Sequence, residues 1–151
     1  MNKLIIFVLI IFSYKVYGKE NLYDNFAFVS FDAVQKELVI DQSLPVKLNH
    51  YLKIWFDNRV RVNGFTGEVE LKISEFKQKI TNMKNGKRVD TSMFFEVYLY
   101  ENSTDFIKKK GEVSAFGEIS GSFSLNEFDD LIENTYLNLV STLSVELKKK
   151  I

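Results

Sequence analysis

The chain has 151 residues, of which 46% are hydrophobic and 15% aromatic. This length and composition predict one domain with a substantial core and exclude an intrinsically disordered chain. Its 20 basic residues balance its 20 acidic residues, so charge predicts neither nucleic-acid binding nor a polybasic membrane anchor. The chain has no cysteine, which excludes disulfides, thiolate catalysis and cysteine-ligated metals.

Residues 1–18 predict a secretory signal peptide, which leaves residues 19–151 as a single α+β domain. Lys3 provides the basic start, Leu4 to Phe12 is an unbroken apolar run, and Gly18 is a small residue that suits cleavage. The run is shorter than the ~20 residues that span a bilayer. We therefore expect an exported protein with no transmembrane span after cleavage. The alternative is an uncleaved leader that keeps the protein associated with the membrane.

The first part of the domain predicts a strand, an ambiguous segment and a helix. Residues 24–33 are rich in aromatic and β-branched side chains, which is typical of a strand, whereas residues 34–42 fit no single structure. A helix is expected from Ser43, a suitable N-cap, to about Asn63, because Gly64 is a natural stop. The apolar stripe of that helix comprises Leu44, Leu48, Tyr51, Leu52, Trp55, Phe56 and Val62.

The second part of the domain predicts three further strands. These strands cover residues 67–80, 92–101 and 112–120, where apolar side chains alternate with polar ones. Residues 82–87 contain an Asn-Gly pair, and residues 102–111 are polar, so both segments predict turns. Because short turns join neighbouring strands, the three strands are expected to be antiparallel.

Two local patterns add detail to this part of the chain. The apolar alternation changes parity between Ile73 and Phe76, which predicts a β-bulge near Ser74–Glu75. Ser124-Leu125-Asn126-Glu127 is a capping box, so a closing amphipathic helix is expected to begin there and to run to about Lys149.

The element order β-α-β-β-β-α predicts an α+β fold. Its centre is a four-stranded, mostly antiparallel sheet, and the two amphipathic helices cover one face of it. The first strand joins the sheet through a right-handed helical crossover. The sequence leaves open whether that strand pairs with the second strand or the fourth.

The other face of the sheet is expected to be open and aromatic. The aliphatic rows suit the face that the helices cover, and the opposite rows carry Phe26, Phe28, Phe94, Tyr98, Tyr100 and Phe116. A sheet face open to water is normally polar, and an exposed aromatic patch usually marks a binding site. These rings therefore predict a docking surface for a partner protein, a second copy of the chain or an acyl chain. Alternatively, residues 34–42 or neighbouring side chains cover them.

Arg59 follows Trp55 by one turn on the apolar stripe of the first helix. The structural interpretation stacks its guanidinium on Trp55 and bridges it to a strand carboxylate. The functional interpretation is an anion-binding arginine at the rim of a pocket. His50 is the only histidine and lies on the polar side of that helix, so no zinc site or serine–histidine pair is expected. We expect no enzyme, no catalytic residue, no metal and no cofactor.

Three segments resemble a known pattern: Leu44-Pro45, Trp55 to Val60, and Gly64 to Gly67. They resemble an uncharacterised family of small exported proteins of Gram-negative bacteria, and the resemblance extends over most of residues 26–149. That family is similar in architecture to lipopolysaccharide-assembly and transport-auxiliary lipoproteins, which pair two helices with a four-stranded sheet. Those lipoproteins carry an acylated cysteine, and this chain has none, which implies a soluble periplasmic form.

The resemblance implies a non-enzymatic periplasmic binding or assembly module that acts in the cell envelope through protein–protein contacts. The alternative is a carrier or chaperone for an apolar ligand, such as a lipid or an unfolded segment of an outer-membrane protein. The partner would then be an envelope protein or a lipid, with no role for nucleic acid.

Overall fold

The computed structural model describes residues 26–101 and 104–149, with the side chains of residues 104–108 excepted. The predicted signal peptide lies outside the described residues. The elements in chain order are β1 (Val29–Phe31), β2 (Gln35–Ile40), α2 (Val46–Arg59), β3 (Val60–Val62), β4 (Glu68–Met83), β5 (Gly86–Glu101), β6 (Thr104–Ser120) and α3 (Leu125–Lys148). Neither described helix has the length and apolar character that crossing a membrane requires.

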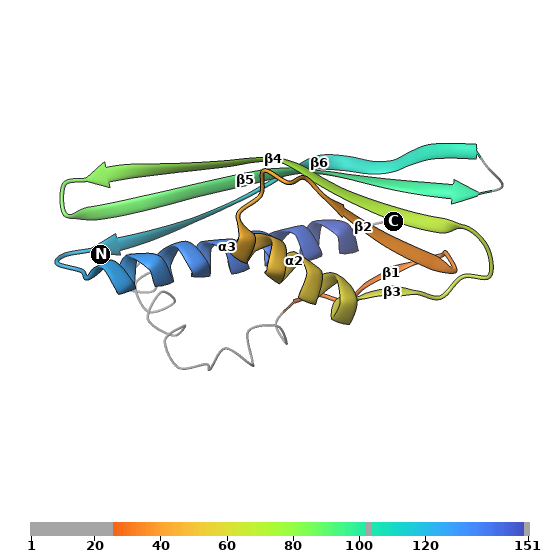
Figure 1. Ribbon diagram of the computed structural model, residues 1–151, viewed down its shortest axis with the longest axis horizontal. Helices are drawn as coiled ribbons and strands as arrows, with labels where there is room; N and C mark the ends of the chain where they lie inside the picture. The colour runs from red at the N-terminus through yellow and green to blue at the C-terminus, as the bar shows by residue number, and fades with distance from the viewer. Residues whose placement is uncertain (1–25, 102–103, 150–151) are drawn as a thin grey trace, which may run out of the picture.

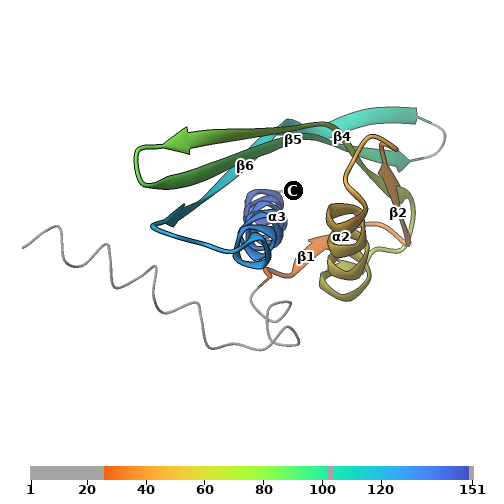
Figure 2. The same cartoon turned by 60° about the vertical axis from the view of Figure 1, so that its left-hand side comes forward.

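The molecule has two layers, a sheet and a pair of helices (Figures 1 and 2). The sheet has the strand order β2-β4-β5-β6, in which β2 is parallel to β4 and the other pairs are antiparallel. Both helices lie on the same side of this sheet (Figure 2). The predicted α+β fold, with a four-stranded and mostly antiparallel sheet and helices on one face, is therefore confirmed.

The first strand of the sheet is not the one that the sequence predicted. Residues 24–33 contribute only β1, which pairs in parallel with β3 in a separate two-stranded sheet. The strand beside β4 is β2, from the segment that looked ambiguous. The alternation of apolar and polar residues in β2 is hard to recognise in the sequence, because Lys36 shares the helix-facing row with Leu38. Pairing with β4, and not local pattern, decides which segment becomes the strand.

The first helix also differs in its bounds. Its N-cap is Pro45, with no side-chain hydrogen bond, whereas the predicted cap Ser43 donates its own N–H to the Asp41 carboxylate at 2.8 Å. The helix ends at Arg59, four residues earlier than predicted, because Val60 begins the strand that pairs with β1. The predicted apolar stripe is otherwise confirmed, with Leu48, Tyr51, Leu52, Trp55 and Phe56 buried.

The two hairpins of β4, β5 and β6 are longer than predicted. β5 begins at Gly86 and β6 at Thr104, so most of the predicted turn at residues 102–111 is strand. A strand can include polar residues because its alternate positions point to opposite faces of the sheet. The predicted bulge is confirmed: the β4–β5 register shifts between Ser74 and Lys77.

The capping box predicted for α3 is confirmed, since Ser124 N donates to the Glu127 carboxylate at 2.7 Å and Glu127 N donates to Ser124 Oγ at 3.2 Å.

The core lies between the sheet and the helices. The helix-facing rows of the sheet meet the apolar sides of α2 and α3. The largest side chains buried there are Trp55, Phe31, Phe95, Leu48, Leu52, Leu71, Ile73, Met93, Leu139, Leu143 and Leu147.

Candidate functional site

The candidate site is the face of the four-stranded sheet that the helices leave uncovered, which we call the open face. On β5, Phe94, Tyr98 and Tyr100 occupy the row opposite the buried row. Phe116 of β6 lies on the same face, opposite Asp90, and is 56% exposed. The sheet thus brings together four of the six aromatic residues that the sequence placed in one patch.

The other two predicted residues lie elsewhere. Phe26 is only 4% exposed and belongs to the core, so its predicted place on the open face is wrong. Phe28 precedes β1 outside the four-stranded sheet, and the guanidinium carbons of Arg59 and Arg61 each lie 4.4 Å from its ring centroid. Both errors have one cause, because the segment that carries these rings pairs with β3 and not with β4.

Two tyrosines form the centre of the open face. The rings of Tyr98 and Tyr100 stack with centroids 6.2 Å apart and an interplanar angle of 16°. Tyr100 Oη donates to the Glu70 carboxylate at 3.0 Å, and Lys72 Nζ lies 3.1 Å from the same oxygen. Lys72 also lies 4.5 Å from the centroid of Tyr98. These contacts hold the rings in fixed positions without burying them, which suits a surface that stacks on a partner.

Titration in this cluster follows from the same contacts. The hydrogen bond to Glu70 raises the pKa of the Lys72 ammonium. Loss of solvation is the larger cause that raises the pKa of Tyr98, and a hydrogen bond to Glu96 is the next. The lysine therefore stays charged and the tyrosine neutral at neutral pH, so the cluster offers aromatic rings, carboxylates and one cation.

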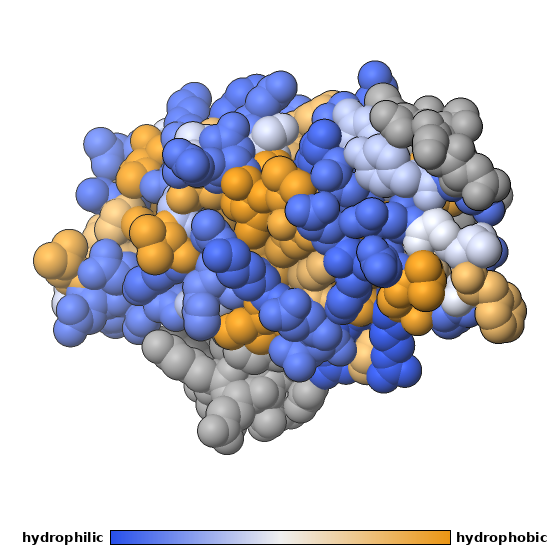
Figure 3. Space-filling view, turned by 45° about the vertical axis from the view of Figure 1, so that its right-hand side comes forward, coloured by the Kyte–Doolittle hydropathy of each residue, from blue (hydrophilic) through white to orange (hydrophobic). Residues whose placement is uncertain are grey.

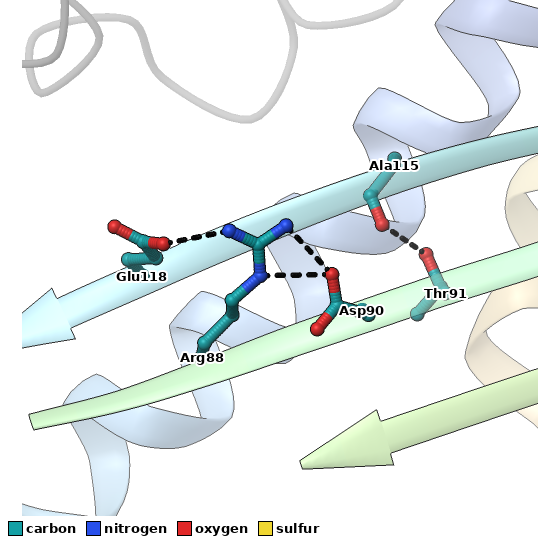
Figure 4. A network of polar contacts seen from close by, with 5 residues as sticks. All are labelled: Arg88, Asp90, Thr91, Ala115 and Glu118. Carbon is teal, nitrogen blue, oxygen red and sulfur yellow. Dashed lines mark hydrogen bonds and ion pairs between the residues drawn. The ribbon is translucent and has the colours of Figure 1, made fainter. Parts of the chain in front are cut away.

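The far end of the open face carries an arginine network (Figure 4). Arg88 Nη2 lies 2.8 Å from Asp90 Oδ1, and Arg88 Nη1 lies 2.9 Å from Glu118 Oε1. The guanidinium also lies 4.1 Å from the centroid of Phe116. An open groove of about 460 Å³ lies here, and its lining includes Lys77, Lys79, Arg88, Asp90, Ser92, Ser114 and Phe116.

The two halves of the open face differ in charge. The half around the tyrosines holds Glu37, Glu68, Glu70, Glu96 and Glu112 against Lys72 and Lys110. The half around the groove holds Lys77, Lys79 and Arg88 against Asp90 and Glu118. One end of the open face is therefore acidic and aromatic, and the other is slightly basic.

Arg59 and Trp55 are not stacked on each other. Trp55 is fully buried and its indole N–H has no hydrogen-bond partner, whereas Arg59 is half-buried and lies over Phe28. Arg59 is the last residue of α2, and its guanidinium lies over Phe28 in place of Trp55, so the predicted stacking partner is wrong. The predicted bridge to a strand carboxylate stays a prediction. Its anion-binding alternative stays a hypothesis.

One exposed residue escaped the sequence analysis. Phe65 is 97% exposed, on the loop between β3 and β4. That loop is tied to the β1–β2 turn by hydrogen bonds from Gly64 N to Ala33 O and from Val34 N to Gly67 O. The flank formed by β1, β2 and β3 mixes hydrophobic and hydrophilic residues (Figure 3). The sequence carries a signal for this exposure, because a phenylalanine in the short segment from Gly64 to Gly67, which a glycine bounds at each end, has few neighbours to cover it.

Possible metal ligands are scattered over the residues that the structure describes. No three His, Asp or Glu side chains within them gather closely enough to bind a metal ion. His50 lies beside Tyr51, with ring centroids 6.0 Å apart. The open face can stack, hydrogen-bond and form ion pairs, which is the chemistry of recognition.

Comparisons with known proteins concern the fold alone. No protein-family model matches the chain, and no curated protein matches its sequence. A minor lipoprotein of Acinetobacter baumannii is 14% identical over 76% of this chain and 91% of that chain, with a TM-score of 0.51. A hypothetical protein of Chlamydia trachomatis is 10% identical over 78% of this chain and 96% of that chain, also with a TM-score of 0.51. The chain therefore shares, at low sequence identity, the fold of a bacterial lipoprotein.

Proposed function

We propose that this chain is a non-enzymatic binding module of the cell envelope, which recognises a partner protein through the open face. The observation that carries the proposal is the row of Phe94, Tyr98 and Tyr100, on a sheet face that neither helix covers. Tyrosine is enriched where proteins bind one another, because it combines a large ring with a polar end. The predicted leader and the lipoprotein fold support a place in the envelope.

The charge of the tyrosine half indicates what the partner presents. Among the side chains that the structure describes, five carboxylates share that half with two lysines, so a basic surface is electrostatically complementary. Arginine suits such a surface because it can stack on tyrosine and pair with a carboxylate. We therefore propose a partner that presents arginine or lysine side chains to Tyr98 and Tyr100.

The alternative, a carrier for an apolar ligand, has less support. A carrier encloses its ligand in an apolar cavity, whereas large side chains such as Trp55 and Phe95 fill the space between the helices and the sheet. The groove on the open face lies open to solvent, so it does not enclose a ligand either.

Affinity capture from periplasmic extract tests the proposal. The protein is compared with its Tyr98→Glu/Tyr100→Glu variant, which removes both stacking rings. Its two added carboxylates would by themselves attract a basic partner, so a loss of capture reports on the rings. We expect at least a tenfold loss of the captured protein, because central interface tyrosines typically contribute 2 kcal/mol or more, roughly.

A matched control places the same change on the helix side. Val46 is 86% exposed and Val145 is 46% exposed, so Val46→Glu/Val145→Glu adds two acidic groups away from the open face. It should keep the captured partner. The proposal fails if the tyrosine variant, shown by circular dichroism to be folded, captures as much partner as the original chain.

A further inference from the structure

Within the part of the chain that the structure describes, no strand pairs with the outer edge of β4 over its second half. β2 pairs with β4 only as far as Ile73, and the bulge follows at once, with Glu75 at φ 52°. From Lys77 to Met83, every described ladder contact of β4 is with β5. A bulge of this kind bends the strand and ends pairing, so the outer N–H and C=O groups beyond it are available to another strand.

The side chains along this edge have a definite pattern. Lys77 and Lys79 face the open face, opposite Ser92 and Asp90, and both are exposed. Neither lysine forms an ion pair with a side chain that the structure describes, because the Asp90 carboxylate is held by Arg88. The alternate positions point to the helix side, where Ile80 is 46% exposed.

This pattern argues against a second copy of the chain on the edge. An antiparallel pairing of two β4 edges about Gln78 would oppose Lys77 of one copy to Lys79 of the other. Like charges directly opposite each other across strands are destabilising. An edge with two uncompensated cations is instead complementary to a strand with acidic side chains at alternate positions.

We propose that Lys77 to Met83 of β4 bind an extended segment of a partner protein as an added strand. Acidic residues of that segment face Lys77 and Lys79, and apolar residues between them lie beside Ile80. Main-chain hydrogen bonds supply affinity in this mode of binding, and the alternating side chains supply specificity. The inference rests on the proposed function only in taking the partner to be a protein.

The test uses two synthetic eight-residue peptides, one alternating glutamate with valine and one alternating lysine with valine. Their dissociation constants are measured by isothermal titration against the full chain. We expect the glutamate peptide to bind at least about tenfold more tightly, because two cross-strand ion pairs replace two repulsive pairs. No binding of the glutamate peptide at about 1 mM, or no preference between the peptides, overturns the proposal.

Charge exchange on the protein supplies the matched variants. Lys77→Glu/Lys79→Glu should reverse the preference, and the milder Lys77→Gln/Lys79→Gln should abolish it without reversal. Lys53→Glu/Lys148→Glu changes two exposed helix lysines and should leave the preference intact. A preference that survives the Lys77/Lys79 changes places the peptide elsewhere and overturns the proposal.

Hydrogen exchange separates this site from the open face. The glutamate peptide should protect outward amides within residues 77–83, whereas protection confined to the free edge of β6 overturns the proposal. The Tyr98→Glu/Tyr100→Glu variant should bind the peptide as the original chain does. Failure of the edge site therefore leaves the result of affinity capture unaffected, and the reverse also holds.

Discussion

Two lysines of the sheet hold the C-terminal ends of the two helices. Lys36 Nζ on β2 donates to Phe56 O at 2.9 Å and to Val60 O at 2.6 Å. Lys109 Nζ on β6 donates in the same way to Glu146 O, at the end of α3. The last carbonyls of a helix lie at the negative end of its dipole. Phe56 O and Glu146 O each accept the backbone N–H of the C-cap residue, and the ammonium is a second donor to them. Each ammonium therefore ties one helix to the sheet.

Replacing Lys36 tests this interpretation. Lys36→Met keeps an apolar stem beside Phe56 but removes the donor, so we expect the free energy of unfolding to fall by about 1–3 kcal/mol. Lys47→Met is the control, since the Lys47 side chain is 61% exposed in its pair with Glu133 and should cost less than about 1 kcal/mol. Urea denaturation of both variants decides, and equal losses would contradict a special role for Lys36.

The same variant has a pH signature. Burial lowers the pKa of Lys36, and the charge of Asp57 acts in the opposite direction. The unfolded chain then binds more protons than the folded one as the pH approaches the ordinary lysine value of 10.5, so this group makes the free energy of unfolding rise with pH. Lys36→Met should lack that part of the slope, and the difference between the two proteins should grow with pH.

At the scale of elements, one glycine determines how the long hairpins fit together. The turn between β4 and β5 is Lys84-Asn85, and Gly86 is the first residue of β5. A Cβ on Gly86 would lie 1.9 Å from the carbonyl oxygen of Ile119 on β6. The Asn-Gly signal located the hairpin correctly, yet this glycine serves the close approach of a third strand.

Gly86→Ala should therefore be costly. Its methyl group meets backbone that cannot rotate away, and its φ of +153° is unfavourable for alanine, so we expect a loss of about 2–4 kcal/mol. Gly121→Ala is the matched control, because Gly121 has φ +78° with nothing within 4 Å of the added Cβ, and strain alone costs about 1–2 kcal/mol. The midpoint temperature of thermal unfolding should be well below that of Gly121→Ala for Gly86→Ala, and the reverse order would refute the steric argument.

The elements that the sequence predicted well depend on neighbours in the chain. The Ser124 capping box, the bulge after Ser74 and the row of Tyr98 and Tyr100 follow from patterns a few residues long. The place of Phe26 could not be predicted, because it depends on β1 pairing with a strand thirty residues later. Strand ends were missed for a similar reason, since polar residues join a strand when a partner holds them.

At the scale of the whole molecule, stability depends on the contact between the helix layer and the sheet. α3 is buried along its second half and exposed at its start: Leu143 has no exposed surface, whereas Leu125 is 75% exposed. Both residues are leucines of the same amphipathic helix. Only the burial decides what each contributes to stability.

Leu143→Ala and Leu125→Ala form a matched pair of truncations on one helix. We expect Leu143→Ala to lower the free energy of unfolding by about 2–5 kcal/mol through lost burial and a cavity. Leu125→Ala should change it by less than about 0.5 kcal/mol. Denaturant titration followed by circular dichroism measures both, and similar losses would show that α3 is not packed as described.

The parallel pairing of β2 with β4 dictates an order of assembly. Gln35 meets Glu68, and Val29 meets Val60, across long intervening segments, whereas Met83 meets Gly86 across a two-residue turn. Closing the long loops costs more chain entropy than closing a hairpin, and such non-local contacts form slowly. A nascent chain emerges from its N-terminus, so β2 stays unpaired until β4 has left the ribosome. The β4-β5-β6 meander is then the template on which β2 closes last.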